Sequence, residues 1–251
     1  GHRNLLEKMK RTNLSFILKG SLKVENENEI LFSNLKLNIN YNKWTSIIGQ
    51  SGSGKSTLLK IIAGIEIPKV FENTITCSPK NYSFSWMAQN DLLLPWASVI
   101  ENITLGQRLR KEKLDINKAH ILLEKVGLKN AAKKLPSTLS GGMRQRVALA
   151  RTIMEDKDII LMDEPFSALD SITRSAIQKL TWKLLKDKTV IMVTHDPLEA
   201  LLLSNNLYYI SKEKLKPINL PISKPFRKIN DDNILYSHKH ILNKLQKSYI
   251  S

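Results

Sequence analysis

A glycine-rich segment at residues 49–57 constrains the fold and chemistry of this chain more than any other feature. It fits the pattern GxxxxGK followed by Ser or Thr, and lies between an apolar run typical of a buried strand and a run with helical spacing. Small residues let backbone N–H groups turn inward around phosphate oxygens, and the helix N-terminus adds partial positive charge. A plain turn that starts a helix is the alternative. The register of the lysine and hydroxyls favours a phosphate site made by Gly49, Gln50, Ser51, Gly52, Ser53, Gly54, Lys55, Ser56 and Thr57.

A second apolar run supplies the acidic groups that a nucleotide site needs. Residues 159–162 are apolar and end directly in Asp163 and Glu164. Burying an apolar strand right up to two adjacent carboxylates costs free energy unless a bound group interacts with these carboxylates. We interpret Asp163 as a Mg²⁺ ligand and Glu164 as the carboxylate that polarises an attacking water. Lys55 is expected to hold the β- and γ-phosphates and the Ser56 hydroxyl to bind Mg²⁺. The alternative is that the two acids only cap the helix that follows.

Strand and helix patterns alternate along the chain, which predicts an α/β fold with a parallel sheet. Strands are expected as a pair over residues 30–49 with a turn at 42–43, and over 81–89, 157–163 and 189–194. Helices are expected over 56–64, over 99–134 with breaks near Gly106 and Gly127, and over 140–154 and 171–185. An amphipathic tail is expected over about 234–245.

Composition excludes several classes of protein. Of the 251 residues, 42% are hydrophobic and 25% charged, which is typical of a globular chain rather than a disordered or fibrous one. The single cysteine, Cys77, excludes an internal disulfide and a zinc site built on cysteines. No apolar run approaches the roughly 20 residues that cross a bilayer. No signal sequence opens the chain, Gly1-His2 is interpreted as a cloning remnant, and a cytoplasmic location is expected.

The net charge of +16 points to an anionic partner. The excess is confined to residues 1–20, 106–134 and 211–251, which carry +4, +6 and +6. None of these segments interleaves aromatic residues as a base-stacking surface does, so we expect no nucleic-acid partner. The segment at 106–134 is either a solvated helix face or lies near an anionic membrane, where a basic residue gains roughly 1 kcal/mol.

Residues 139–146, LSGGMRQR, form the most specific motif in the chain. They resemble the signature motif of the ATPase subunits of ABC transporters. The other motifs of that family follow in order, with Gln89 in the Q-loop, the acids after residue 162, a D-loop at 167–170 and His195 as the switch histidine. The resemblance covers roughly residues 14–210.

The resemblance implies a phosphate-loop fold of the RecA-like type. Its core is a mainly parallel sheet, with an antiparallel β part and an inserted helical subdomain at about residues 97–150. The ATPase domain is expected at 12–210, after an N-terminal tail at 1–11 and before a short C-terminal extension at 211–251.

The resemblance also implies how the site works. Family members form a head-to-tail homodimer that sandwiches two ATP molecules, each between one subunit's phosphate loop and the other's signature helix. Ser140, Gly141 and Gly142 are expected to bind the γ-phosphate from across the dimer. Gln89 is expected to contact Mg²⁺ or the attacking water, and His195 to hold the γ-phosphate and Glu164. The expected catalytic residues are therefore Glu164, His195, Gln89 and Lys55, and the expected Mg²⁺ ligands are Ser56, Gln89 and Asp163.

The adenine platform departs from the family pattern. The family places an aromatic residue about two dozen positions before the phosphate loop, and the matching residues 23–27 contain none. Val24 is one candidate to cover the base, and Phe16 or Phe32 approaching from elsewhere is another.

The region after Gln89 resembles one branch of the family. Residues 90–96, NDLLLPW, and 220–225, LPISKP, are similar to stretches of importers for nitrate, sulfonate, taurine and thiamine precursors. This implies an ATPase peripheral to the inner face of the cell membrane that docks on integral membrane permease subunits. It would power import of a small organic or inorganic anion or a thiamine precursor, captured outside by a separate solute-binding protein. The alternative for Trp96 is that it only packs its loop.

Other classes share the phosphate chemistry. The ATPase subunit of a lipid or lipoprotein exporter is the main alternative, and residues 93–96 favour the importer. Soluble DNA-maintenance ATPases insert long coiled coils or zinc modules between phosphate loop and signature, whereas Lys55 and Ser140 are only 85 residues apart. A module that binds nucleotide without hydrolysing it is disfavoured because the lysine, both acids and His195 are all present.

Overall fold

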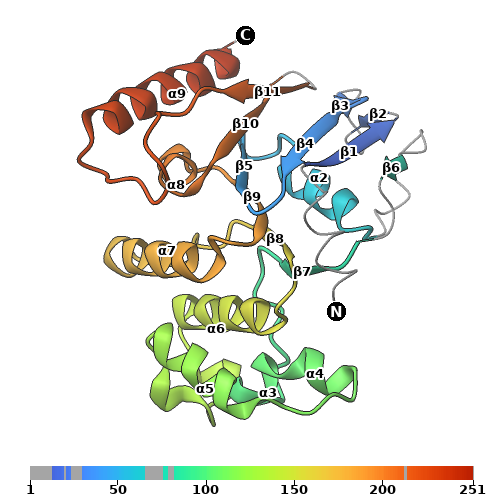
Figure 1. The fold of residues 1–251 in the computed structure, drawn as a ribbon, viewed down its shortest axis with the longest axis vertical. Helices are drawn as coiled ribbons and strands as arrows, with labels where there is room; N and C mark the ends of the chain where they lie inside the picture. Colours follow the sequence, from blue (N-terminus) through green and yellow to red (C-terminus); the bar gives the residue numbers. More distant parts are fainter. Residues whose placement is uncertain are drawn as a thin grey trace, which may run out of the picture. The chain divides into compact units, whose positions relative to one another are not determined.

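The computed structural model describes residues 13–19, 21–23, 30–65, 76–78, 82–211 and 214–250. The chain divides into two compact units, one formed by Gly1–Tyr82 with Lys186–Ser251 and the other by Ser83–Leu185 (Figure 1). Most strands pair in parallel and alternate with helices, and a separate part is antiparallel, so the α/β prediction is confirmed.

The first unit is built on two central parallel strands that are buried along their whole length. β5 (Trp44–Ile48) pairs in parallel with β9 (Thr189–Thr194) on one side and with β10 (Asn206–Ser211) on the other. β11 (Lys214–Ile218) adds to β10 in antiparallel. Every residue of β5 and β9 is buried, as expected for strands covered on both faces.

A second, antiparallel group of strands corrects one prediction. β1 (Asn13–Lys19) pairs with β4 (Lys36–Asn40) and β6 (Thr76–Ser78), and β2 (Ser21–Lys23) pairs with β3 (Ile30–Ser33). The two strands predicted within 30–49 are present as β4 and β5, but β4 pairs with β1 and not with β5. β4 alternates between exposed and buried residues while β5 is wholly buried. The first pattern suits a sheet with one solvated face and the second suits a covered parallel sheet.

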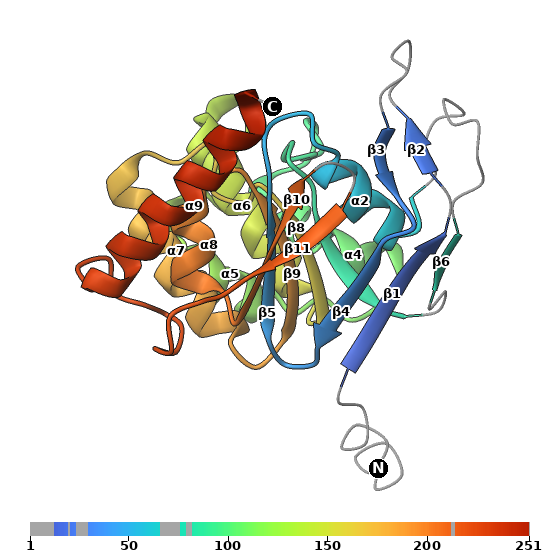
Figure 2. The same ribbon diagram turned by 90° about the horizontal axis from the view of Figure 1, so that it is seen from above.

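The described part of this unit also contains three helices: α2 (Lys55–Ile62), α8 (Pro197–Leu203) and α9 (Asp232–Ile250). α9 contains the predicted amphipathic tail, and it lies beside α8 in both ribbon views (Figures 1 and 2). Its Ile241 is buried in a cluster with Ile48, Leu201 and Leu207. Within the described ranges, no helix combines the length and apolar content needed to cross a bilayer.

The second unit combines two parallel strands with a group of helices. β7 (Phe84–Met87) pairs with β8 (Ile159–Asp163). The helices are α3 (Val99–Ile103), α4 (Leu105–Leu109), α5 (Ile116–Lys125), α6 (Gly141–Met154) and α7 (Ser171–Leu185), with short 3₁₀ turns at Lys129–Ala131 and Pro136–Thr138. α6 contacts α3, α5 and β7 and is central to this unit (Figure 1).

The helix break predicted near Gly106 falls two residues before it. Gly106 is inside α4, and the break between α3 and α4 falls at Thr104. The Thr104 hydroxyl donates to the Ile100 carbonyl at 2.9 Å, a local bond of the kind that competes with regular helix geometry. The break near Gly127 is confirmed, since α5 ends at Lys125 and Gly127 has φ +74°.

Candidate functional site

The glycine-rich segment forms a turn between β5 and α2. β5 ends at Ile48, one residue before the segment, and α2 begins at Lys55 within it. Gly54, at the N-cap of α2, has φ +87°, a conformation that glycine adopts without steric cost. No side chain caps this N-terminus and its first turn holds no acidic residue. The helix end is therefore suited to a bound anion.

Two polar side chains lie inside this turn. Lys55 is buried, and its Nζ donates to the Gln50 carbonyl at 2.7 Å. The Ser53 hydroxyl is also buried and has no hydrogen-bond partner among the described residues. A buried polar group without a partner indicates a ligand or solvent position. The turn thus offers an ammonium group and a hydroxyl to an anion that contributes several oxygen acceptors.

The C-terminal helix reaches this turn through an interaction that sequence reasoning missed. The Gln50 side-chain amide donates to the Leu245 carbonyl of α9 at 2.9 Å. Leu245 also packs against the cluster that contains Ile48, the last residue of β5. The two partners are 195 positions apart, so no local pattern in the sequence signals the contact.

Register places His195 near the start of the glycine-rich segment. Ile48 and Thr194 are paired residues on the adjacent parallel strands β5 and β9. Gly49 and His195 follow them directly, so both leave the same edge of the sheet. His195 is exposed and precedes Asp196, whose carboxylate accepts from the Leu198 backbone N–H at 2.9 Å and caps α8. The structure therefore brings the phosphate turn and the predicted switch histidine together within the first unit.

The second unit brings the acids and Gln89 together in the same way. Met87 and Met162 are paired residues at the ends of the parallel strands β7 and β8. Gln89 lies two residues beyond the first strand, and Glu164 directly follows the second. Asp163 and Glu164 are both buried, and Glu164 has φ +48°. For a residue with a side chain this conformation costs about 1–2 kcal/mol, so its surroundings must hold it.

The two acids do not cap the next helix. α7 begins at Ser171, and the carboxylate of Asp170 accepts from the Thr173 backbone N–H at 3.0 Å. Asp170 therefore serves as the cap. The alternative that Asp163 and Glu164 cap this helix is therefore wrong.

The signature motif forms the start of α6. Ser140 is the N-cap, with its hydroxyl accepting from the Met143 N–H at 3.2 Å, and Ser140 and Gly141 are exposed. Gly142 faces the D-loop, because a Cβ added to it would stand 3.2 Å from the Ala168 carbonyl oxygen. The N-terminus of α6 is thus suited to an anion, while Gly142, its second residue, faces Ala168 and Leu169.

Gln145 connects α6 to the segment after β8. Its Nε2 donates to the Glu164 carbonyl at 3.2 Å and to the Ser167 hydroxyl at 3.3 Å, and its Oε1 accepts from the Ala168 N–H at 2.8 Å. Sequence reasoning did not single out this residue. The one available signal is a polar residue on the buried face of an otherwise apolar helical pattern, which identifies no partner.

The loop after Gln89 is attached to α6 by two arginines. Arg151 donates to the carbonyls of Asp91 and Leu92 at 2.6 and 2.9 Å. Arg144 donates to the Asp91 carboxylate at 3.1 Å. Burial lowers the pKa of the Arg151 guanidinium, with Asp91 opposing this shift. The loop therefore has a defined conformation set by the signature helix.

This loop exposes apolar side chains. Trp96 is 76% exposed and Leu92 is 60% exposed. The interpretation that Trp96 only packs its loop is wrong, since most of its surface contacts no other residue of the chain. An exposed tryptophan on a well-anchored loop suits contact with another molecule.

No aromatic platform for adenine is present among the residues proposed for it. Phe16 and Phe32 are both completely buried, and Phe16 packs edge-on against Tyr82 with ring centroids 5.2 Å apart. Neither ring has a free face for a base. Val24, the third candidate, lies outside the described residues.

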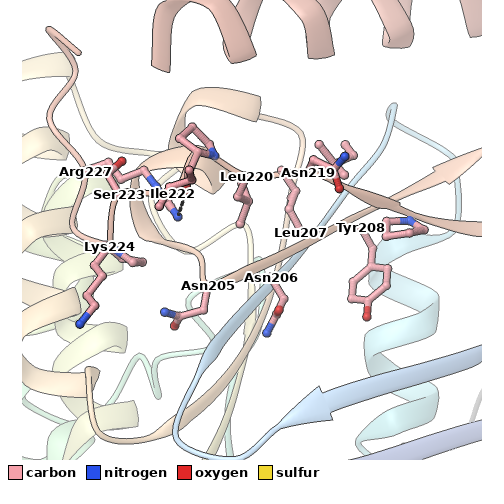
Figure 3. Close-up of a pocket in the computed structure, with 14 residues that line it drawn as sticks. Asn205, Asn206, Leu207, Tyr208, Asn219, Leu220, Ile222, Ser223, Lys224 and Arg227 are labelled. Atoms are coloured by element: carbon pink, nitrogen blue, oxygen red, sulfur yellow. Dashed lines mark hydrogen bonds between the residues drawn. The ribbon is translucent and has the colours of Figure 1, made fainter. Parts of the chain in front are cut away.

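A pocket of about 390 Å³ lies on the first unit, between β10, β11 and the segment after them (Figure 3). Its lining includes residues 220–225, the LPISKP stretch, and none of the residues predicted to bind nucleotide. One wall holds Arg227, whose Nη1 donates to the carbonyls of Leu201 and Ser204 at the end of α8, at 2.8 and 2.7 Å. Burial lowers the pKa of this guanidinium. The arginine fastens the C-terminal extension to α8, the helix that follows His195.

Comparison with known proteins identifies the family. Residues 32–167 match the family model described as ABC transporter. The chain belongs to the ABC transporter ATPases. It is 42% identical over 224 residues to an uncharacterized ABC transporter ATP-binding protein of Haemophilus influenzae, covering 86% of this chain and 93% of the relative. It is 43% identical over 196 residues to an aliphatic sulfonates import ATP-binding protein of Rhodococcus jostii, covering 76% of this chain and 78% of the relative.

A solved structure agrees with this assignment. A dimeric ATP-binding cassette in a post-hydrolysis state, bound to ADP and Pi, superimposes with a TM-score of 0.69 and 28% identity, covering 85% of this chain and all of that one. As an ABC transporter ATPase, the chain binds ATP and couples its hydrolysis to transport. The predicted family, fold class and enzymatic activity are therefore confirmed.

Proposed function

We propose that this ABC ATPase powers import of a small organic or inorganic anion, with sulfonates as the first candidates. The exposed, arginine-anchored loop at residues 90–96 carries this proposal, because it matches the importer branch in sequence and has no packing role for its tryptophan. The relative from Rhodococcus jostii is named for import of aliphatic sulfonates. A thiamine precursor remains the other substrate class of that branch.

The proposed partners are integral membrane permease subunits, with a solute-binding protein acting on the far side of the membrane. Leu92 and Trp96 form the apolar part of the docking surface on this chain. The ATPase, with its domain at about residues 12–210, then lies peripherally at the inner face of the membrane.

The working form is a head-to-tail homodimer that encloses two ATP molecules. Ser140 and Gly141 are exposed at the N-terminus of α6, where backbone donors and the helix dipole favour a γ-phosphate held by a second subunit. The structural neighbour is likewise a dimer, bound to ADP and Pi.

Several of the predicted site residues are suited to Mg-ATP. Lys55 exchanges its bond to the Gln50 carbonyl for the β- and γ-phosphate oxygens. A serine hydroxyl, Ser56, and a buried carboxylate, Asp163, are oxygen donors of the kind that Mg²⁺ prefers. Mg²⁺ commonly takes only one or two protein ligands and completes its shell with phosphates and water. The ion, when bound, neutralises charge on the phosphates during transfer.

Hydrolysis then requires a positioned water. Glu164 accepts a proton from the water while the water oxygen attacks the γ-phosphorus. The bond between that phosphorus and the bridging oxygen of ADP breaks in this step. Gln89 orients the water, and His195 donates a hydrogen bond to the γ-phosphate. Because phosphoryl transfer depends mainly on positioning and charge neutralisation, this set is chemically sufficient.

The Glu164→Gln variant tests the catalytic assignment. It removes the proton acceptor while keeping nearly the same shape, so we expect ATP binding to persist and hydrolysis to fall by a factor of 100 or more. Binding is measured by equilibrium dialysis with labelled ATP, and hydrolysis by phosphate release. Lys55→Ala is the matched variant that should weaken binding itself. A Glu164→Gln enzyme with close to the parental hydrolysis rate would show that another group activates the water.

Deletion of the gene in its source organism tests the importer assignment. We expect loss of growth with an alkanesulfonate or taurine as the sole sulfur source, and normal growth on sulfate. Re-expression of the parental chain should restore growth, and the Glu164→Gln chain should not. Unchanged growth and uptake across sulfonates, nitrate and thiamine precursors would reject import of this solute class.

A further inference from the structure

Gln145 of α6 forms a bridge to the segment that begins at Glu164. The side chain is 6% exposed, and both ends of its amide are used. Nε2 donates to the Glu164 carbonyl and to the Ser167 hydroxyl, and Oε1 accepts from the Ala168 N–H. We infer that Gln145 is a positioning residue for ATP hydrolysis, which holds Glu164 in its reactive orientation. This inference rests on the proposed role of Glu164.

The backbone at Glu164 needs such support. Its φ of +48° lies in the left-handed region, which a residue with a Cβ adopts only where its surroundings enforce it. Its carbonyl accepts from the Ser167 N–H at 3.3 Å, from the Ser167 hydroxyl at 3.2 Å and from Gln145 at 3.2 Å. Each of these bonds is long, so the conformation depends on the set rather than on one bond.

Glutamine is suited to this position because the bridge needs a donor and an acceptor on one side chain. A carboxylate would accept from Ala168 but would repel the Glu164 carbonyl. A methionine would fill the same volume and make neither bond. Loss of the amide also leaves the Ala168 N–H without this acceptor. The chemistry therefore predicts that even the methionine, which keeps the volume, impairs hydrolysis, whereas a purely space-filling role would tolerate it.

The bridge also joins the signature motif to the backbone of Glu164 within one subunit. Gln145 lies on α6 one turn beyond Gly142, and a Cβ added to Gly142 would stand 3.2 Å from the Ala168 carbonyl oxygen. Because Ser140 caps the same helix, a rigid-body shift of α6 would move both this serine and the amide that bonds to the Glu164 carbonyl.

The test compares Gln145→Met, Gln145→Glu and Gln145→Ala in the full-length chain. We expect kcat for ATP hydrolysis to fall roughly 10- to 100-fold, as misplacement of a catalytic group does, while KM and the ATP dissociation constant change less than about threefold. The methionine variant keeps the volume and separates the loss of the hydrogen bonds from a cavity. Thr152→Val is the control, because Thr152 is equally buried in α6 but its hydroxyl bonds only within that helix, to the Ala148 carbonyl. Urea unfolding confirms that each variant is folded.

A double variant distinguishes this inference from the proposed function. If Gln145 acts through Glu164, then adding Gln145→Met to Glu164→Gln lowers the residual rate no further. If Glu164→Gln abolishes hydrolysis but Gln145→Met retains the parental kcat, the inference is wrong and the proposed function stands. If Glu164→Gln itself hydrolyses at the parental rate, the catalytic assignment fails first. Equal losses in Thr152→Val and Gln145→Met would assign the effect to general instability and overturn the positioning role.

Discussion

A Cβ atom on Gly142 would stand 3.2 Å from the carbonyl oxygen of Ala168, whereas a Cβ on Gly141 would meet only Arg144 Nη2, at 3.8 Å. Gly142 therefore sets how closely α6 approaches the D-loop, and Gly141 does not.

We expect Gly142→Ala to lower the free energy of unfolding by about 1–3 kcal/mol, because a backbone carbonyl must shift to admit the methyl group. Gly141→Ala should leave it unchanged or raise it by up to about 1 kcal/mol, since alanine favours the helix. Urea titration of both variants measures the difference. Equal stabilities would mean that the D-loop moves freely away from α6.

Arg227 is expected to stabilise the first unit. Its guanidinium satisfies the carbonyls of Leu201 and Ser204 at the C-terminal end of α8, where positive charge also complements the helix dipole. Arg227→Met should lower the free energy of unfolding by about 2–4 kcal/mol, because buried carbonyls lose charged donors. Lys228→Met, at the exposed neighbour, is the control and should change it by less than about 0.5 kcal/mol. A similar small effect of both variants would show that solvent replaces the arginine.

The cap at Asp170 should make stability depend on acid pH. Hydrogen bonding to Thr173 holds the pKa of this carboxyl below its ordinary value of 3.8. Because the folded pKa lies below the unfolded one, the ionised carboxylate stabilises the fold above about pH 4, and this contribution is lost as the pH falls through the folded pKa. The urea midpoint should therefore fall more between pH 7 and pH 3 in the parental chain than in the Asp170→Asn variant. Identical drops would exclude a role for this group.

Trp96 should matter for assembly and not for the isolated chain. Trp96 is 76% exposed. We therefore expect Trp96→Ser to change the free energy of unfolding by less than about 0.5 kcal/mol and to leave the ATPase rate of the isolated chain intact. Co-purification with the permease subunits should be lost. Ile172→Ser is the matched control, because Ile172 is 84% exposed on α7 in the same unit, and it should keep the permease. Retention of the permease by Trp96→Ser would place the docking surface elsewhere.

Local patterns in the sequence predicted most elements well. α7 and β9 were predicted with the bounds that the structure has, and α6 differs only in that Ser140 is its cap. These elements depend on side-chain periodicity and on capping residues close in sequence. Strand partners depend on contacts between distant segments, and so the pairing of β4 with β1 was missed.

The sequence by itself determined the family and predicted the phosphate site, because a glycine-rich turn between strand and helix and the motif at 139–146 are contiguous patterns whose chemistry can be inferred locally. Tertiary structure alone decided what holds those residues. Gln145 reaches Glu164 across 19 positions, and Gln50 reaches Leu245 across 195. It also decided that Phe16 and Phe32 are enclosed while Trp96 is exposed. Burial and long-range hydrogen bonds arise only when separate elements pack together. Local patterns of residue types do not identify these tertiary partners.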